Sequence, residues 1–393
     1  MAKLADTTKD LTIAGRLLIR RLVRANPNPD EAEPDAASFE ASARALLAAA
    51  PSGLIAGFDF YSVPCNQPPW FDTGLDLPPG ARVTTLAIGR TWLARSLDVW
   101  VGAAFQLWFR IGDAGEAFRG TRRSHSFAAP EGGRLHLASY FPGEWSDRAG
   151  HLATKPKEYN RVAGALTVLV IRWQEAPETA LPRLAATGDI EGLLAGEQDR
   201  LANPPVPPKD WSYLWTLGPA EIFHDKPPPS PARHIMCRTC RDVGILRKPV
   251  SMPLTPSTRL TWRWRIDTLP STLREDTIPT HDYLSIAVEF DDGQDLSYYW
   301  SAALPPGTIY RCPLPTWKNR ETHMVLRSGA VGLGKWQTES RLLHTDYASA
   351  IGSPPARIVA VWLIANSLFQ RREGTCEYAD ITIETPDEIV AVS

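Results

Sequence analysis

The chain has 393 residues, enough for two or three domains that each bury a core. Hydrophobic residues make up 44%, charged residues 22%, and the formal net charge is −2, so the composition is that of an ordinary globular protein and nothing in it favours nucleic acid as a partner. The 35 prolines predict many turns and little long helix, and the 14 tryptophans suit β-sandwiches, whose aromatic faces pack together or stack on sugar rings.

The N-terminal segment lacks the pattern of a secretory signal, because four arginines interrupt its one apolar run. No stretch reaches the roughly 18 consecutive apolar residues that a membrane span needs. The five cysteines, of which only Cys237 and Cys240 are close together, predict no disulfide framework. We therefore expect a cytoplasmic protein without a membrane span.

Residues 1–53 are expected to form a helical N-terminal region. Apolar residues recur at roughly helical spacing over 10–24, with arginines on the opposite side. Such a helix either docks on its own protein or lies on a membrane or a partner. A second, alanine-rich helix should follow, with Asp35 or Ser38 as its N-cap and Gly53 after its end.

Residues 54–173 change to an apolar pattern of period two, interrupted by turn residues such as LPPGA and PEGG. This pattern predicts a β-sandwich of about 120 residues. The expected strands are RVTTLAIG, AFQLWFRIG, GRLHLASYF and GALTVLVIRW.

Residues 174–233 are expected to be a proline-rich connector that contains one short helix, capped by Asp189. Its apolar part, WSYLWTLGPAEIF, should dock onto one of the sandwiches. Residues 234–393 return to period two, which predicts a C-terminal jelly-roll sandwich. Its expected strands are GILRKPVSMPL, RLTWRWRIDTL, DYLSIAVEF, LSYYWSA, HMVLRSG, WQTESRLL, ARIVAVWLIAN and CEYADITIE. The predicted fold class is thus mainly β, with two antiparallel, jelly-roll-like β-sandwiches.

The first sandwich resembles the calcium-dependent galactose-binding lectins of bacteria, the galactophilic lectin family. The matching segments are WFDTGLDLPPGARVTTLAIG, FRIGDAGEAF, FAAPEGGRLHLASY and AGALTVLVI, in the family's order. The resemblance implies a lectin-like sandwich. It also implies a calcium ion that binds two sugar hydroxyls, held by an Asp and paired Asn residues between the last two strands.

The calcium loop of this chain departs from the family's pattern. Tyr140 stands where the calcium Asp is expected, Asn160 occupies one asparagine position, and Asp147 lies in an insertion. Calcium takes six to eight oxygen ligands, which this loop supplies poorly. Calcium is therefore either bound, with Asp147 and Asn160 as ligands, or lost while the fold is kept. Tyr140 and Asn160 are candidate ligand-binding residues of this sandwich.

The second sandwich resembles an uncharacterised bacterial family of unknown function. The matching segments are LTWRWRID, DYLSIAVEFDDG, LSYYWS, LRSGAVGLGKWQTESRLLHTDY and EYADITIE. The family carries no established activity, so this resemblance implies a fold and no chemistry.

Cys237 and Cys240 have the CxxC spacing of half a zinc site, with His234 as a possible third ligand. A fourth ligand, Cys312 or Cys376, would have to come from a distant part of the sequence. The alternative is that both cysteines are small residues of a strand or turn.

The segment HDYLSIAVEFDDGQDLSYYW predicts two strands joined by an Asp-Asp-Gly turn, which assigns Asp291 and Asp292 to the turn. Alternation then places Tyr283, Ser285, Ala287 and Glu289 on one face, expected to be either the concave side of a jelly roll or its wet side.

A second polar row lies downstream, where alternation puts Glu321, His323, Val325 and Arg327 on one face. Such rows are either solvated surface or the lining of a cleft for sugars or small polar ligands. The candidate catalytic residues are the carboxylates Glu289 and Glu339 and the proton shuttles His281 and His323. The candidate ligand-binding residues in this sandwich are Tyr299, Arg327, Trp336 and Arg341.

Three functions are consistent with these patterns. The leading hypothesis is non-catalytic binding of carbohydrate or a glycoconjugate through one or both sandwiches. The second is an enzyme that acts on a saccharide or another polar small molecule in a cleft of the C-terminal sandwich. The third is a structural module of a larger assembly, such as a homo-oligomer.

Overall fold

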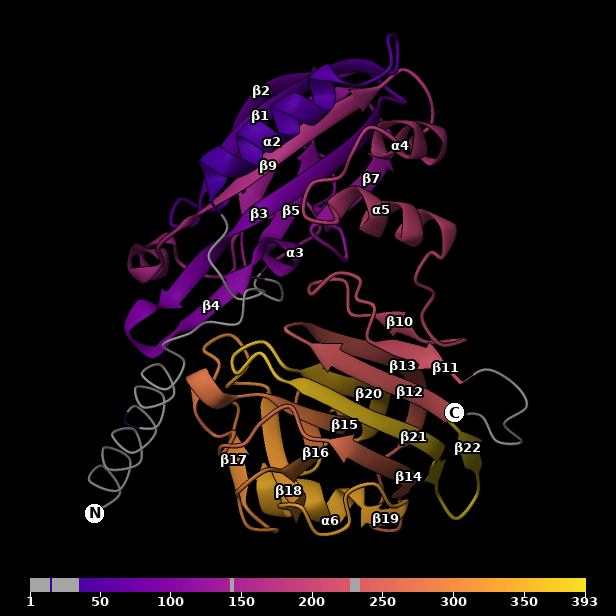
Figure 1. Ribbon diagram of the computed structural model, residues 1–393. Helices are drawn as coiled ribbons and strands as arrows, with labels where there is room; N and C mark the ends of the chain where they lie inside the picture. The colour runs from indigo at the N-terminus through magenta and orange to yellow at the C-terminus, as the bar shows by residue number, and fades with distance from the viewer. Residues whose placement is uncertain (1–14, 16–34, 142–144, 227–233) are drawn as a thin grey trace. The chain divides into compact units, whose positions relative to one another are not determined.

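The computed structural model describes residues 15, 35–141, 145–226 and 234–393. The helix expected over 10–24 lies outside the described residues, apart from Gly15. The chain forms two compact units, Met1–Pro205 and Val206–Ser393, here called the N-terminal and C-terminal units (Figure 1). The boundary falls inside the segment 174–233. In the part of the chain that is described, no helix has the length and apolar character needed to cross a membrane.

The N-terminal unit consists of two antiparallel sheets, as expected for a sandwich. A five-stranded sheet has the order β1-β9-β3-β4, with β7 also paired to β3, and a four-stranded sheet has the order β2-β8-β5-β6. The strands are β1 (Ile55–Pro64), β2 (Phe71–Leu77), β3 (Arg82–Ala94), β4 (Val99–Gly102), β5 (Leu107–Ile111), β6 (Phe118–Arg119), β7 (Ser124–Ala128), β8 (Gly133–Ser139) and β9 (Ala165–Trp173).

Helices cover one face of the five-stranded sheet (Figure 1). Helix α2 (Ala36–Ala48) begins at Asp35, whose carboxylate accepts from the backbone N–H groups of Ala37 and Ser38, so the predicted cap is confirmed. The other helical segments of this unit are η2 (Arg95–Leu97), α3 (Ala103–Gln106), η3 (Pro156–Arg161), α4 (Pro177–Ala185) and α5 (Leu193–Ala202).

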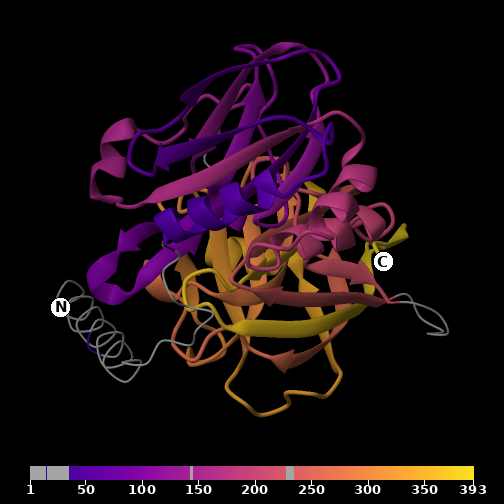
Figure 2. The ribbon, with the colours of Figure 1, turned by 45° about the horizontal axis from the view of Figure 1, so that its top comes forward.

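Helix α4 was not expected, because its prolines were assigned to a connector. Pro177 occupies the first helical turn, where a missing N–H costs nothing, and Ala180, Leu181 and Leu184 are fully buried. Burial of this apolar stripe against the sheet stabilises the helix despite the internal Pro182. Figure 2 shows α4 and α5 side by side along the unit.

Helix α5 is anchored by a buried carboxylate, which leads to a stability prediction. Glu197 is fully buried, accepts from the Ser126 N–H at 2.6 Å and pairs with Arg200 at 2.5 Å. Burial disfavours its charged form, but the hydrogen bonds and the charge of Arg200 outweigh that effect and lower the pKa of Glu197.

We expect Glu197→Gln to lower the free energy of unfolding by roughly 2 kcal/mol at neutral pH, because hydrogen bonds to a charged group are lost. Since the folded-state pKa is depressed, this stabilisation exists above the unfolded-state pKa and disappears as the pH falls through the folded-state pKa. Urea denaturation at pH 7 and pH 4 should show a smaller acid loss in the variant. The control Glu191→Gln breaks the exposed pair with Arg123 and should change stability by well under about 1 kcal/mol.

The C-terminal unit also consists of two sheets, so the mainly β fold class is confirmed (Figure 1). The seven-stranded sheet has the order β10-β13-β20-β15-β16-β18-β17, and the six-stranded sheet has the order β11-β12-β21-β14-β19 with β22 paired to β21. The strands are β10 (Ser212–Tyr213), β11 (Phe223–Asp225), β12 (His234–Cys240), β13 (Val243–Pro253), β14 (Arg259–Thr268), β15 (Tyr283–Phe290), β16 (Asp295–Ser301), β17 (Ile309–Arg311), β18 (Glu321–Ser328), β19 (Gln337–Leu342), β20 (Arg357–Asn366), β21 (Glu373–Glu384) and β22 (Ile389–Ala391). Among its described residues this unit also has two helical segments, η4 (Ile278–Thr280) and α6 (Leu343–Ala350).

The main core of this unit is rich in aromatic residues. On β14, Trp262 and Trp264 point into it, whereas Arg263 and Arg265 point away. Trp264 packs on Trp300 of β16 at 6.1 Å between ring centroids. The period-two pattern of β14 therefore identified its buried face correctly.

One pairing departs from the expected antiparallel sheets. Strands β16 and β18 are parallel, because the chain leaves β16, forms β17 at the sheet edge and returns through β18 between the two. Residues of these connections pack on the sheet. Leu304 is buried and Trp317 is half-buried on the face of the seven-stranded sheet that carries Tyr299.

The face of β15 with Tyr283 and Glu289, expected to be either the concave side of a jelly roll or its wet side, is largely buried. Tyr283, Ser285 and Ala287 are at most 5% exposed, and only Glu289 keeps access to solvent. The interpretation as a solvated face was wrong, since segments distant in the sequence cover it. One of them is WSYLWTLGPAEIF, in which Leu214 and Leu217 pack on this face, so the predicted docking of that segment is confirmed.

Candidate functional site

The hairpin of β15 and β16 carries two of the predicted candidates, Glu289 and Tyr299, and four aspartates lie on or beside it. Asp292 accepts from the Gln294 N–H and Asp291 accepts from the Arg357 N–H, while Gly293 has a φ of 79°, so both carboxylates belong to the turn as predicted. Asp282 is fully buried and accepts from two backbone N–H groups, those of Phe369 and Gln370. These three carboxylates are structural.

His281 and His323 come together in a group that we call the buried cluster, with Cys312 and Glu321 as its other members. One ligand atom from each residue lies within 4.8 Å of those of the other three, and all four side chains are at most 3% exposed. His323 and Glu321 lie two residues apart on β18, so both point to the same face. Cys312 follows edge strand β17, and its N–H donates to the Glu321 carbonyl at 3.0 Å.

The imidazole of His281 is oriented by the loop before β15. Its Nδ1 lies 2.6 Å from the Glu275 carbonyl oxygen, which can only accept, so Nδ1 carries the proton. Burial lowers the pKa of His281 to about 3, which keeps the ring neutral. Its Nε2 therefore carries a lone pair, which can accept a hydrogen bond from the Cys312 thiol, whose Sγ lies 3.4 Å away. Burial, followed by the charge of Glu321, raises the pKa of the Cys312 thiol.

The other half of the buried cluster contains a polar side chain without a hydrogen-bond partner. Among the described residues, neither ring nitrogen of His323 makes a hydrogen bond, and its Nε2 lies 3.5 Å from Glu321 Oε1, at ion-pair distance. The ring stacks on Tyr310 at 5.0 Å. Glu321 accepts from the Tyr283 hydroxyl at 3.0 Å. Burial disfavours its charge, but the neighbouring imidazoles and the thiol hold the pKa of Glu321 below its usual range.

Glu289 is the centre of a second arrangement on the same face of the seven-stranded sheet. Its carboxylate pairs with Arg247 at 3.0 Å and with Arg320 at 3.4 Å, and Arg320 also reaches the buried Asp295 at 3.2 Å. The side chains of Glu289, Arg247 and Arg320 are 17%, 32% and 35% exposed, so solvent and solutes reach them.

Two tryptophans adjoin this ion-pair network. The Arg320 guanidinium lies over the ring of Trp317 at 5.4 Å and over that of Trp362 at 5.0 Å. Trp362 is buried, whereas Trp317 is half-buried and meets it edge-on at 6.3 Å. The surface here combines carboxylate acceptors, guanidinium donors and one accessible aromatic ring, which we call the Glu289 site (Glu289, Arg247, Arg320 and Trp317).

Glu339 does not join Glu289. It lies on β19 of the six-stranded sheet, where it accepts from the Trp264 indole at 3.1 Å and pairs with Arg327 at 2.5 Å. Arg327 leaves the row of His323 because a bulge places it opposite Trp300. Within the described residues, Glu289 and Glu339 share no ion-pair or hydrogen-bond partner. These contacts therefore do not bring the two predicted catalytic carboxylates together.

The remaining candidates of this unit lie apart from one another. Tyr299 is fully buried, and its hydroxyl accepts from Tyr310 at 3.0 Å. Arg341 pairs with Asp346 at 2.6 Å. Trp336 is half-buried over the six-stranded sheet, with His234 at 4.9 Å and Arg263 at 5.0 Å from its ring centroid.

The predicted ligand residues of the N-terminal unit also separate. Tyr140 is fully buried, with its ring 4.0 Å from Trp145, so it contributes to the core. Asp147 and Asn160 are exposed, and Asp147 contacts His151 Nδ1 at 2.8 Å. Among the described His, Cys, Asp and Glu side chains, no group with metal-binding geometry includes Asp147.

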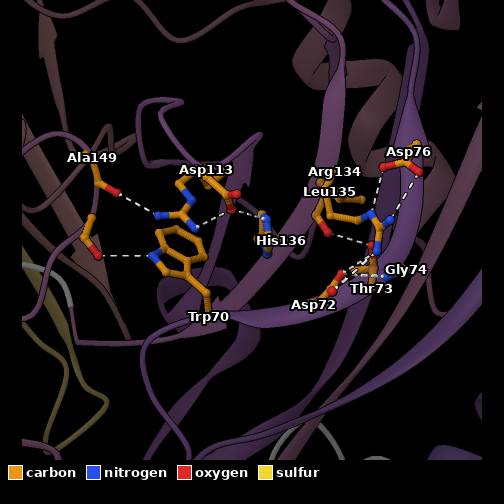
Figure 3. A network of polar contacts seen from close by, with 12 residues as sticks. Trp70, Asp72, Thr73, Gly74, Asp76, Asp113, Arg134, Leu135, His136 and Ala149 are labelled. Atoms are coloured by element: carbon orange, nitrogen blue, oxygen red, sulfur yellow. Dashed lines mark hydrogen bonds and ion pairs between the residues drawn. The ribbon is translucent and has the colours of Figure 1, made fainter.

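The loop that carries Asp147 is fixed onto the four-stranded sheet. Trp70 stacks on Trp145 at 5.1 Å, and its indole donates to the Gly150 carbonyl at 3.0 Å. Arg110 donates to the Ala149 carbonyl at 3.2 Å (Figure 3). Aromatic stacking and these two backbone contacts thus hold the loop against the sheet.

Figure 3 also shows how Arg134 bridges Asp72 and Asp76 of β2, at 3.1 Å and 2.7 Å. Both aspartates are more than half exposed, and exposed pairs of this kind contribute little to stability. Asp113 contacts His136 at 3.3 Å nearby.

The CxxC motif does not form half a metal site with His234. Cys237 is buried and lies opposite Cys376 in the sheet, whereas Cys240 is exposed, because a step of three residues along a strand reverses the side. Burial, followed by the proximity of Cys376, raises the pKa of the Cys237 thiol. His234 instead contacts Glu377 at 3.3 Å. All five cysteines are free in the structure.

Sequence reasoning missed Arg247, Arg320 and Trp317 as partners of Glu289. It placed Glu321 beside His323, but it did not bring Cys312 or His281 to them. The Glu-x-His spacing on a strand was the one local signal for the cluster, since it places both side chains on one face.

Comparison with known proteins agrees with both resemblances seen in the sequence. Residues 230–382 match the family model described as "Protein of unknown function (DUF3047)". No curated protein matches the chain. The matched solved structures include the "EclA N-terminal domain; PllA-like lectin", with 20% identity over 31% of this chain and 99% of that chain, and a TM-score of 0.24.

Two further matched structures concern carbohydrate-related domains. The xyloglucanase domain of NopAA from Sinorhizobium fredii is 6% identical over 46% of this chain and 94% of that chain, with a TM-score of 0.26. The CBM22-1-CBM22-2 tandem domain of Paenibacillus barcinonensis Xyn10C is 10% identical over 86% of this chain and 92% of that chain, with a TM-score of 0.22. At these scores the likenesses carry no functional conclusion.

Proposed function

We propose that the protein binds carbohydrate or a glycoconjugate without catalysis, and that the Glu289 site of the C-terminal unit makes the contact. The observation that carries the proposal is one accessible carboxylate held between two accessible arginines beside a half-buried tryptophan. Sugars are recognised by this combination, because their hydroxyls both donate and accept while their C–H faces stack on aromatic rings.

The contacts of Glu289 favour binding over catalysis. A glycosidase needs two carboxylates across the scissile bond, about 5–9.5 Å apart, one of which must deliver a proton. Glu289 is paired with two guanidinium groups, so its carboxylate is positioned by two arginines as a hydrogen-bond acceptor. The other predicted carboxylate, Glu339, is held in the opposite sheet by Arg327 and Trp264.

The test is a glycan array probed with the full chain, with and without calcium, followed by titration of the best binder. We expect Glu289→Ala and Trp317→Ala each to weaken binding at least about tenfold, since a hydrogen bond to a charged group or a stacking contact contributes roughly 1–3 kcal/mol. The exposed Glu388→Gln variant should bind like the wild type.

Melting temperatures separate lost contacts from lost folding in this experiment. An array without a binder under either condition would refute carbohydrate binding. Full affinity in both Glu289→Ala and Trp317→Ala would place the binding surface elsewhere in the chain.

A further inference from the structure

We propose that the C-terminal unit holds a structural zinc ion in the buried cluster. The four ligands would be His281 Nε2, Cys312 Sγ, a carboxylate oxygen of Glu321 and a ring nitrogen of His323. The proposal is independent of the Glu289 site and of carbohydrate binding.

The donor atoms have the type and the spacing that zinc requires. Zinc takes imidazole nitrogen, thiolate sulfur and carboxylate oxygen at about 2.0–2.3 Å, and a tetrahedron with such bonds has edges of about 3.3–3.8 Å. Two distances in the cluster already match an edge, 3.4 Å from Cys312 Sγ to His281 Nε2 and 3.5 Å from His323 Nε2 to Glu321 Oε1. The largest separation, 4.8 Å, needs only a small inward shift.

The residues that contact the proposed ligands make the kind of supporting contacts found around protein-bound zinc. The backbone carbonyl of Glu275 accepts from His281 Nδ1 and so presents Nε2 to the centre of the cluster, which is the usual outer-shell contact of a metal-bound histidine. The Tyr283 hydroxyl donates to Glu321 and fixes its carboxylate. Stacking on Tyr310 holds the ring of His323.

An ion would also give His323 a partner. The His323 side chain is fully buried, yet neither of its ring nitrogens makes a hydrogen bond among the described residues. A buried polar group without a partner costs free energy, and such groups are rare in folded proteins. A metal bond would satisfy one of the two ring nitrogens and so lower that cost.

The charge of the cluster suits a divalent cation. One thiolate, one carboxylate and two neutral imidazoles carry two negative charges, which a Zn²⁺ ion cancels. This neutrality matters because the site is buried, where an unbalanced charge is expensive. Four protein ligands leave no open position for water or substrate, so the ion would stabilise the fold and take no part in a reaction. It would tie β18 to the end of β17 and to the loop before β15.

Metal analysis of the full chain tests the proposal. Protein purified without chelators from zinc-supplemented medium should contain one zinc per chain by plasma mass spectrometry. After chelation and loading with Co²⁺, the wild type should show visible bands of tetrahedral intensity together with a thiolate-to-cobalt charge-transfer band in the near ultraviolet. Removal of zinc should lower the melting temperature, and addition of zinc should restore it.

Matched cysteine variants locate the ion. Cys312→Ser should abolish the charge-transfer band and weaken zinc binding at least about tenfold, whereas Cys240→Ser should leave both unchanged. Tyr283→Phe removes one supporting hydrogen bond and should weaken zinc binding while retaining the band. Wild-type protein that takes up no stoichiometric zinc and shows no charge-transfer band would overturn the proposal even if a variant failed to fold. Loss of the band in Cys240→Ser, or its survival in Cys312→Ser, would overturn it too.

Discussion

Alanine in place of Asp282 is expected to lower the free energy of unfolding of the C-terminal unit by about 3–5 kcal/mol. The Asp282 carboxylate is fully buried and accepts from the N–H groups of Phe369, at 2.9 Å, and Gln370. Its removal leaves two buried donors without their acceptor, and each costs the desolvation free energy of a polar group. Urea denaturation followed by tryptophan fluorescence measures the loss.

Two companion variants make this measurement specific. Asp282→Asn keeps one acceptor oxygen and should lose less stability than Asp282→Ala. Asp387→Ala removes an exposed carboxylate near the C-terminus and should stay within about 0.5 kcal/mol of the wild type. A wild-type unfolding curve for Asp282→Ala would mean that the two N–H groups find other acceptors.

Replacement of Trp264 by alanine should have an effect of similar size, about 3–5 kcal/mol. The side chain is fully buried between Trp262 and Trp300, at 5.8 Å and 6.1 Å between ring centroids, and its indole N–H donates to Glu339. The variant leaves a cavity in the main core and removes a hydrogen bond to a charged acceptor.

The matched control is Trp336→Ala, because Trp336 is only half-buried on the outer side of the same sheet. Its loss should cost clearly less than that of Trp264. Equal unfolding free energies for the two variants would contradict the assignment of the inner and outer faces of β14. Glu339→Gln adds a further check, since it keeps an acceptor for the indole and should cost less than Trp264→Ala.

Many strand positions were predictable from local pattern, but others, such as β1 and β2, were not. In RLTWRWRID every second residue is apolar, and β14 buries those residues as expected. The Asp-Asp-Gly turn and the Asp35 cap were predictable for the same reason, since each depends on the chemistry of a few consecutive residues. Helix α4 was not predicted from the sequence, because its stability comes from burial of Leu181 and Leu184 against the sheet.

The candidate sites were only partly predictable. Period two correctly grouped Glu321 with His323, but it could not show that the face is covered, because Leu217 and Trp317 reach it from segments distant in the sequence. The period-two pattern also placed Arg327 on the face of Glu321 and His323. A bulge in the pairing of β18 turns Arg327 to the other face.

By itself, therefore, the sequence determined the mainly β class, many of the strand positions and which residues have the chemistry to bind a metal or a sugar. Only the tertiary structure decided which of them meet. His281 and Cys312 are 31 residues apart and become neighbours because β17 and the loop before β15 converge beside β18. Glu289 and Glu339 were predicted as a pair and lie in different sheets. The physical reason is that strand order, bulges and the covering loops depend on contacts between distant segments, which no local pattern encodes.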